Sequence, residues 1–296
     1  MVVTTAPEVS LEQSPIHRQS TRRRLGSIPA LLLASFLGLL ILIPMLWMFI
    51  GSFKTQQEFL ESPVWALPQQ WNLDNYVAAW TTGNFPLYFA NTVVAVIPAL
   101  FVMLLLGSAA GFALEVLVWK GRSIVALLFL TGIMIPVQMI LLPLFTVYFQ
   151  TGLTGTLWPL FLTYTAAGLP LTVFLMATYF RAIPREVFEA GTIDGASLIQ
   201  QFFQIALPMM RNALFTVGLV QFFFLWNDLL IALTFVNTGS LRTLQVGLLN
   251  FSGQFGSVQY GPLFAAICLN VGIMFIIYLF LNQQIQKGLV SGSVKG

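Results

Sequence analysis

The chain has 296 residues, of which 57% are hydrophobic and only 8% are charged. A soluble domain carries about 25% charged residues, so a soluble fold of this length could not bury so much apolar surface, and the composition indicates an integral membrane protein. The net charge of +3 comes from basic residues scattered over short segments between apolar runs, which excludes a nucleic-acid-binding patch.

The N-terminal part predicts a tail and then a first membrane span. Residues 1–24 are polar and end in three arginines, a pattern typical of a disordered cytoplasmic tail. No charged residue interrupts residues 25–53, a run longer than the ~20 residues that a spanning helix needs. The run is too long for the apolar region of a signal peptide, so we expect a retained span, kinked at Pro44. The loop 54–87 that follows is polar and carries tryptophans suited to a membrane interface.

The next apolar runs predict three more spans. The second covers about residues 88–114, and its Gly107 and Gly111 form a GxxxG pair that either allows a neighbouring helix to approach closely or occurs by chance. No charge occurs in residues 123–180, enough for a third and a fourth span on either side of a break at 150–156. Pro136 and Pro143 in the third span are typical either of a cavity-lining bundle or of simple bending.

A fifth span is expected over Ala213–Phe235 and a sixth over Leu263–Leu281, separated by the polar loop 237–260. The fold class is therefore an all-α integral membrane protein with six transmembrane helices. Its expected parts are the tail 1–24, a six-span domain over 25–287 and a cytoplasmic C-terminal tail over 288–296.

The distribution of basic residues predicts the orientation. Six spans place both termini on one side of the membrane, and eleven basic residues fall on that side, whereas only Lys54 and Arg242 fall on the other. Because short cytoplasmic loops carry the excess of Lys and Arg, the termini are predicted to be cytoplasmic. The eleven residues are Arg18, Arg22, Arg23, Arg24, Lys120, Arg122, Arg181, Arg185, Arg211, Lys287 and Lys295.

Between the fourth and fifth spans, the segment Arg181–Arg211 gathers charge and has the pattern of two helices joined by a turn. Pro184 suits a first helical position, and acidic residues follow it in the early turns, where they favour the helix dipole. Asp194 and Gly195 then break the pattern, and Asp194 is expected to cap the second helix. A hairpin of capped helices between two membrane spans indicates a surface that a partner protein binds.

The chain lacks the residues of an enzyme or of an energy-coupling site. It contains no Gly-Lys dipeptide, hence no P-loop, and neither a metalloprotease motif nor a GxSxG motif. With one cysteine and one histidine, no metal site is expected. An ion-coupled carrier would bury charges along its path, yet Asp228 is the one such candidate and lies about 26 Å along a helix from Arg211, near the outer boundary.

Four polar positions within spans are candidates for a substrate path. They are Gln138, Gln221, Asn227 and Asp228. The three amides could meet sugar hydroxyls or make hydrogen bonds between helices. Asp228 fits either a structural role at the interface or a role at the outer gate.

Residues 189–196, which read EAGTIDGA, followed by IALP at 205–208, resemble the EAA loop of binding-protein-dependent ABC importer permeases. The sequence departs from that pattern at Gly191, where alanine is usual. The Trp226-Asn227-Asp228 segment and the glycine-rich C-terminal residues look like the carbohydrate-importer branch, the maltose-transporter type. The resemblance covers the chain from the first span onward.

The resemblance implies a non-catalytic permease subunit in the prokaryotic cell membrane. It would pair with a second, homologous permease and with two cytoplasmic ATPase subunits, which bind ATP and magnesium in place of any cofactor in this chain. An extracytoplasmic solute-binding protein would deliver the sugar. Residues 186–196 would be the coupling helix, and Val187, Ala190 and Gly191 share a face with the spacing i, i+3, i+4. The expected coupling residues are Glu186, Val187, Glu189, Ala190, Gly191, Asp194, Gly195 and Ala196.

The outward loop 237–260 resembles the segment of maltose-type permeases that reaches into the binding protein. Asn250, Ser252 and Gln254 are the expected contacts, although an ordinary flexible loop fits the same residues. The sequence thus predicts an ATP-driven sugar importer subunit, without indicating which sugar. The alternatives are a permease of the same family for another solute, such as glycerol phosphate or a peptide, and an ion-coupled carrier, against which the missing intramembrane charges argue.

Overall fold

The computed structural model describes residues 27–236, 238–253 and 257–293. Regular structure in these residues is helical, apart from an isolated antiparallel bridge between Ser252 and Val258. The expected tail 1–24 lies outside the described residues, and the tail 288–296 is helical as far as Ser293. In chain order the helices are α1 (Ser27–Gly51), α2 (Gln56–Glu61), α3 (Asp74–Trp80), α4 (Phe85–Glu115), α5 (Arg122–Met134), η1 (Val137–Ile140), α6 (Leu141–Gln150), α7 (Trp158–Arg181), α8 (Arg185–Ile193), α9 (Leu198–Gln200), η2 (Gln201–Ala206), α10 (Leu207–Met209), α11 (Arg211–Trp226), α12 (Leu230–Phe235), α13 (Leu244–Gly247), η3 (Leu248–Phe251) and α14 (Tyr260–Ser293).

The chain divides between Met48 and Phe49 into two compact units. Helix α1 is apolar around its whole circumference and has Pro44 in its interior. Within the described residues, four helices are long and apolar enough to cross a membrane: α1, α4, α7 and α14. Two further pairs of helices, each sharply bent, pass the same test together and bring the number of candidate spans to as many as six.

The third expected span consists of two helices rather than one. Helix α5 ends at Met134, and the chain continues through η1 into α6 with a bend of 86°. Pro136 stands at the break and lacks the N–H that a continuous helix would need. It also restricts the residue before it, and Ile135 accordingly has an extended backbone (ψ 113°). The proline therefore ends the first helix instead of merely kinking it.

The fifth expected span, Ala213–Phe235, is also interrupted. Helix α11 ends at Trp226, and the short helix α12 follows after a break. The Asp228 carboxylate accepts hydrogen bonds from the backbone N–H groups of Ile231 (3.3 Å) and Ala232 (3.0 Å). Since a carboxylate that accepts such bonds starts a helix, Asp228 separates α12 from α11.

Helices α4 and α7 approach each other closely. A side chain at Gly107 would collide with Thr172, and a Cβ at Gly111 would lie 2.9 Å from the backbone nitrogen of Ala177. The two glycines therefore allow the backbones to approach closely, which is the first of the two interpretations that the GxxxG spacing left open.

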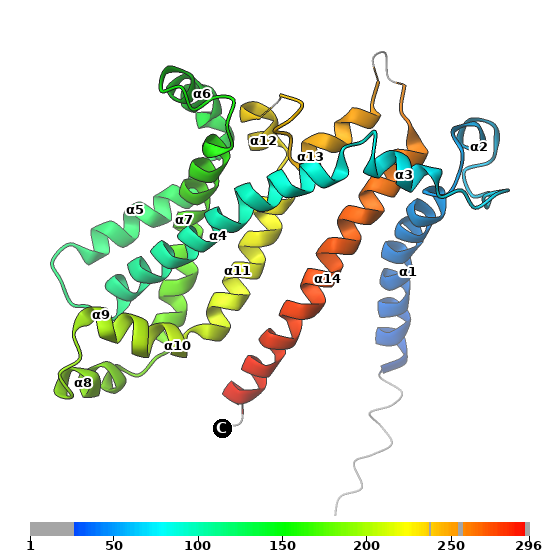
Figure 1. Ribbon diagram of the computed structural model, residues 1–296. Coiled ribbons are helices and arrows are strands. Elements are labelled where there is room, and N and C mark those ends of the chain that lie inside the picture. Colours follow the sequence, from blue (N-terminus) through cyan, green and yellow to red (C-terminus); the bar gives the residue numbers. More distant parts are fainter. Residues whose placement is uncertain (1–26, 237, 254–256, 294–296) are drawn as a thin grey trace, which may run out of the picture. The chain divides into compact units, whose positions relative to one another are not determined.

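Buried polar side chains connect α11 to its neighbours. Gln221 donates to the Gly168 carbonyl (3.1 Å) and to the Thr172 hydroxyl (2.9 Å) of α7. Trp226 donates its indole N–H to Asn270 of α14 at 2.8 Å. Within this unit, Figure 1 shows α8, α9 and α10 at the end of the bundle where α7 finishes and α11 starts, and α12 and α13 at the opposite end.

Candidate functional site

Helix α8 is the amphipathic element of the charged segment between α7 and α11. It begins directly after Pro184, which has an extended backbone (ψ 136°) and so precedes the helix instead of occupying its first position. Phe188 and Gly191 are buried, whereas Glu186 and Glu189 are exposed. The three-residue spacing within each pair places the buried residues on one face of the helix and the acids on another.

The turn after α8 differs in one respect from the expected one. Asp194 ends α8 as its C-cap, so the expectation that it caps the second helix was wrong. Ser197 has that role: its hydroxyl accepts from the Gln200 N–H (3.3 Å), and its own N–H donates to the Gln200 side chain (2.8 Å). The Ser-x-x-Gln spacing is the sequence signal for this capping box. Between the two caps, Gly195 has φ +78°, a conformation that favours glycine.

The two arms of this hairpin, residues 181–211, are joined by hydrogen bonds and close packing. Gln201 is buried, and its amide donates to the Thr192 hydroxyl (3.0 Å) and to the Ala196 carbonyl (3.2 Å). A Cβ on Gly191 would lie 2.7 Å from the terminal carbon of Ile205, so the arms are in close contact there. The hairpin is thus a self-contained element, and Gln201 is a structural residue that sequence reasoning did not identify.

An aromatic cluster connects the hairpin to the bundle. Phe112 of α4 lies 5.7 Å from Phe188 of α8, 5.5 Å from Phe202 of η2 and 5.8 Å from Phe180 of α7, measured between ring centroids. All four rings are buried. Aromatic rings at this distance stabilise each other beyond the apolar area that they bury. The cluster therefore joins both arms of the hairpin to α4 and α7 through Phe112.

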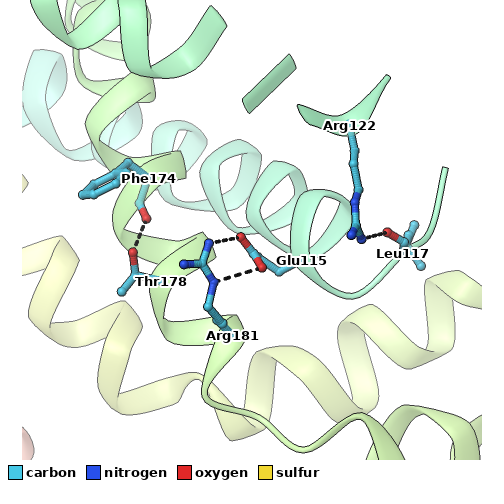
Figure 2. A network of polar contacts seen from close by, with 6 residues as sticks. All are labelled: Glu115, Leu117, Arg122, Phe174, Thr178 and Arg181. Atoms are coloured by element: carbon cyan, nitrogen blue, oxygen red, sulfur yellow. Dashed lines mark hydrogen bonds and ion pairs between the residues drawn. The ribbon is translucent and has the colours of Figure 1, made fainter. Parts of the chain in front are cut away.

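An ion pair lies next to the hairpin, at the ends of α4 and α7. The Arg181 guanidinium donates to both carboxylate oxygens of Glu115, at 2.6 and 3.3 Å (Figure 2). Arg122, the first residue of α5, donates to the Leu117 carbonyl at 3.3 Å in the same region. The end of the bundle that carries the hairpin therefore also carries a group of basic side chains.

The residues expected to contact a partner are divided between the two faces of the hairpin. Gly191 is buried between the arms, so it is not on the exposed face with Ala190. The exposed face also presents large apolar side chains that the sequence analysis did not select: Ile193 is 85% exposed, and Leu198 and Ile199 are exposed as well. Of the other expected residues, Glu186, Glu189, Ala190, Asp194 and Gly195 are exposed, while Val187 and Ala196 are half-buried.

The four candidates for a substrate path lie in different surroundings. Gln138 is exposed in η1, at the break of the third span, and Gln221 is buried in hydrogen bonds between α11 and α7. Asn227 is exposed and accepts a hydrogen bond from Gln245 at 3.3 Å. Asp228 is half-buried and accepts a hydrogen bond from the Tyr164 hydroxyl at 2.9 Å in addition to its two backbone bonds.

The segment between α12 and α14, which the sequence predicts to face outward, makes hydrogen bonds to α4 at several positions. Asn91 donates to two carbonyls of the loop, and Leu244 donates its N–H to the buried Thr92 hydroxyl at 2.9 Å. Asn250 donates to the Tyr88 hydroxyl at 2.9 Å and accepts from the Arg242 guanidinium. Ser252 is exposed, and Gln254 lies outside the described residues. In the described part of the chain, no three His, Cys, Asp or Glu side chains gather in a way that could hold a metal ion.

Comparison with known proteins places this arrangement in one family. Residues 103–288 match the model of the family described as "Binding-protein-dependent transport system inner membrane component". The chain is 35% identical, over 93% of its length and 91% of the relative, to the diacetylchitobiose uptake system permease protein NgcG of Streptomyces coelicolor. It is 31% identical, over 89% of its length and 95% of the relative, to the trehalose/maltose transport system permease protein MalG of Thermococcus litoralis.

A solved structure shares the fold. One chain of a bacterial ABC transporter involved in the import of the acidic polysaccharide alginate superposes with a TM-score of 0.76 at 21% sequence identity. The superposition covers 91% of the present chain and 99% of that chain. The arrangement of helices is therefore the arrangement found in an ABC transporter.

Proposed function

This chain belongs to the family of inner membrane components of binding-protein-dependent transport systems, and from that membership we propose that it couples ATP hydrolysis by a partner to the import of a sugar or oligosaccharide. As a member of the family it is the multi-pass membrane permease of a prokaryotic ABC transporter and is not itself an enzyme. ATP hydrolysis belongs to an ATPase partner, and a binding protein delivers the solute.

The construction of the hairpin supports a coupling role for it. Its outer face presents Glu186 and Glu189 to a partner, together with the highly exposed Ile193. Its inner face packs Phe188 against Phe112 of the bundle. An element that is fastened internally, exposed on one side and packed on the other would move as a body when the partner moves. We infer that residues 186–196 form the helix that sits in a groove of the ATPase.

Six membrane spans with cytoplasmic termini agree with the observed helices. The spans would be α1, α4, the broken pair α5–α6, α7, α11 and α14, and α12 would continue the fifth span beyond its break. The second sharply bent pair of candidate helices instead joins Leu198–Met209, in the second arm of the hairpin, to α11 at 75°. In this order the hairpin would lie on the same side as Lys120 and Arg122, and the distribution of basic residues supports a cytoplasmic location for that side. The loop from residue 238 to Val258 then faces outward, where Ser252 would meet the binding protein.

The names of the relatives support a carbohydrate substrate. One transports diacetylchitobiose, another trehalose and maltose, and a third, from Rhizobium meliloti, is an alpha-glucoside transport system permease. We propose that a second, homologous permease completes the path and that two ATPase subunits bind the ATP and magnesium. Within this chain, Asn227 and Gln138 remain path candidates because both are exposed.

Reconstitution tests the proposal. The purified chain, its partner permease and its ATPase would be placed in vesicles with the binding protein and a radiolabelled sugar. Uptake should require the ATPase and ATP. Uptake that persists without the ATPase, or that an ion gradient drives, would contradict the proposed function.

A charge reversal tests the hairpin alone. Glu189→Lys should abolish ATP-dependent uptake or assembly with the ATPase while leaving membrane insertion intact, because it reverses a charge on the face that contacts the partner. Asp74→Lys, on the exposed N-terminal residue of α3, is the matched control and should not affect binding of the ATPase. Normal uptake by the Glu189→Lys variant would contradict the coupling role.

A further inference from the structure

A cleft opens between α5 and α7 at the hairpin end of the bundle. Its volume is about 770 Å³, within the range of ligand-binding pockets. The hairpin end of the cleft, here called the mouth, carries Glu115, Arg122 and Arg181, and the rest of the lining is apolar except for Ser123 and Thr178. The apolar residues used below are Ala126, Leu130, Phe174 and Ala177.

The cleft has the shape of a wedge. Near the middle of α7 the two helices touch, since a Cβ on Gly132 would lie 3.0 Å from the ring of Pro170. Beyond that contact, the cleft is lined by the half of α5 that starts at Arg122 and by the half of α7 that ends at Arg181. The helices therefore diverge toward the hairpin end, and the space between them is open to whatever surrounds the bundle there.

The charge at the mouth is positive. Arg181 is paired with Glu115, but its side chain is still 72% exposed. Arg122 donates a hydrogen bond of 3.3 Å to a backbone carbonyl. Among the interactions drawn in Figure 2, it is not paired with a carboxylate. Lys120 adds a further exposed positive charge two residues away. The mouth thus has two basic side chains for one acidic side chain.

We propose that this cleft binds one anionic phospholipid, with its phosphate at Arg122 and Arg181 and an acyl chain between α5 and α7. The placement in the cytoplasmic leaflet rests on the orientation given under the proposed function. Basic pockets between membrane helices at that depth attract anionic headgroups. An apolar helix of a partner would fill the wedge but would offer no negative charge to the basic side chains of the mouth.

Retention of lipid by the assembled transporter tests the proposal. The complex would be purified from vesicles of phosphatidylethanolamine containing phosphatidylglycerol, and bound lipid would be identified by native mass spectrometry. Arg122→Gln should weaken retention of phosphatidylglycerol about fivefold, the effect of one basic residue near an anionic surface. Ala126→Trp should reduce retention by filling the wedge while leaving the charges unchanged. Arg185→Gln removes a positive charge outside the cleft and is the matched control.

The outcomes separate the headgroup, the acyl chain and transport. Equal retention of phosphatidylglycerol by Arg122→Gln and the unaltered complex would overturn the headgroup assignment. The assignment would also fail if the unaltered complex retained phosphatidylethanolamine as well as it retains phosphatidylglycerol. Retention unaffected by Ala126→Trp would show that no acyl chain enters the wedge and would overturn the site. Because lipid retention is measured without ATP or sugar, a failure here is distinguishable from a failure of the transport function.

Discussion

Gln221 is a polar side chain within a span whose surroundings decide its role. It is 2% exposed, and its amide donates to the Gly168 carbonyl and the Thr172 hydroxyl of α7. From sequence, such a residue fits a sugar path as well as a contact between helices. Its burial and its two bonds assign it to the contact between α11 and α7.

Replacing Gln221 by leucine should therefore destabilise the protein without altering substrate affinity. Hydrogen bonds between membrane helices contribute roughly 0.6–1.7 kcal/mol, and the expected loss of unfolding free energy lies in that range. Thermal unfolding in detergent measures the stability, and the concentration dependence of uptake measures the affinity. Gln138→Leu, at an exposed position, is the control for stability. A large rise in the KM for sugar with unchanged stability would instead assign Gln221 to the substrate path.

Glu58 accepts hydrogen bonds that stabilise the segment 54–73, which contains α2. Partial burial tends to raise its pKa, but hydrogen bonds from the backbone N–H groups of Thr55 (2.7 Å) and Gln69 (2.6 Å) outweigh burial and lower the pKa below the ordinary 4.5. Because the folded pKa lies below the unfolded one, the charged carboxylate stabilises the segment above about pH 4.5. That stabilisation is lost as the pH falls through the lower, folded value.

Proteolysis of residues 54–73 in intact vesicles should consequently accelerate below pH 4.5. Glu58→Gln should increase cleavage already at pH 7 and remove most of the acid dependence, since the capping box contributes about 1 kcal/mol. Glu61→Gln is the control, because its carboxylate accepts only from Gln57 of the same helix among the bonds described. An acid dependence that survives in Glu58→Gln would assign it to another group.

At the scale of elements, the close approach of α4 and α7 depends on their glycine contacts. Gly107→Val should force the helices apart, because its side chain would collide with Thr172. Such overpacking costs about 1–3 kcal/mol. Gly272→Val in α14 is the matched control, because a Cβ there meets nothing within 4 Å. Thermal unfolding of the two purified variants decides the point, and equal stability would contradict the close packing.

The sequence predicts where the long helices lie better than it predicts where a span is broken into two helices. Apolar runs place helices at 29–51, 85–115, 158–181 and 260–280, because only a helix satisfies its backbone in lipid. The break at Pro136 depends on its missing N–H, and the break at Asp228 depends on local hydrogen bonds; apolar periodicity encodes neither. The cap of the second hairpin helix was a different kind of miss: Asp194 was expected there, three residues before the observed Ser197, although Ser197 and Gln200 have the spacing of a capping box.

The same limit applies to the candidate site. The motif at 189–196 locates the hairpin, and its acids are exposed as a docking surface requires. Which side of α8 faces inward depends on Phe112, more than seventy residues earlier in the chain. No pattern within the hairpin reveals that contact. The burial of Gly191 against Ile205 and the exposure of Ile193 likewise become visible only in three dimensions.

At the scale of the whole molecule, the proposed coupling role would require that the hairpin and the bundle move together. Phe112 is the residue where α4, α7 and both arms of the hairpin meet. The Arg181–Glu115 pair links the ends of α4 and α7 nearby, but it is largely exposed and therefore a weaker connection. Coupling between the ATPase and the membrane path should accordingly depend more on the aromatic contacts than on the ion pair.

Phe112→Leu tests that dependence. Leucine keeps an apolar side chain in place, so the protein should still insert and bind its ATPase, but the ring contacts to Phe188 and Phe202 are lost. Stimulation of ATP hydrolysis by sugar-loaded binding protein should fall severalfold, within the 5–150-fold range typical of coupling between sites. Phe101→Leu, on an exposed position of the same helix, should leave the stimulation unchanged. If both variants retain full stimulation and full uptake, the hairpin transmits its motion by another route. If Glu115→Gln alone abolished stimulation, that route would be the ion pair.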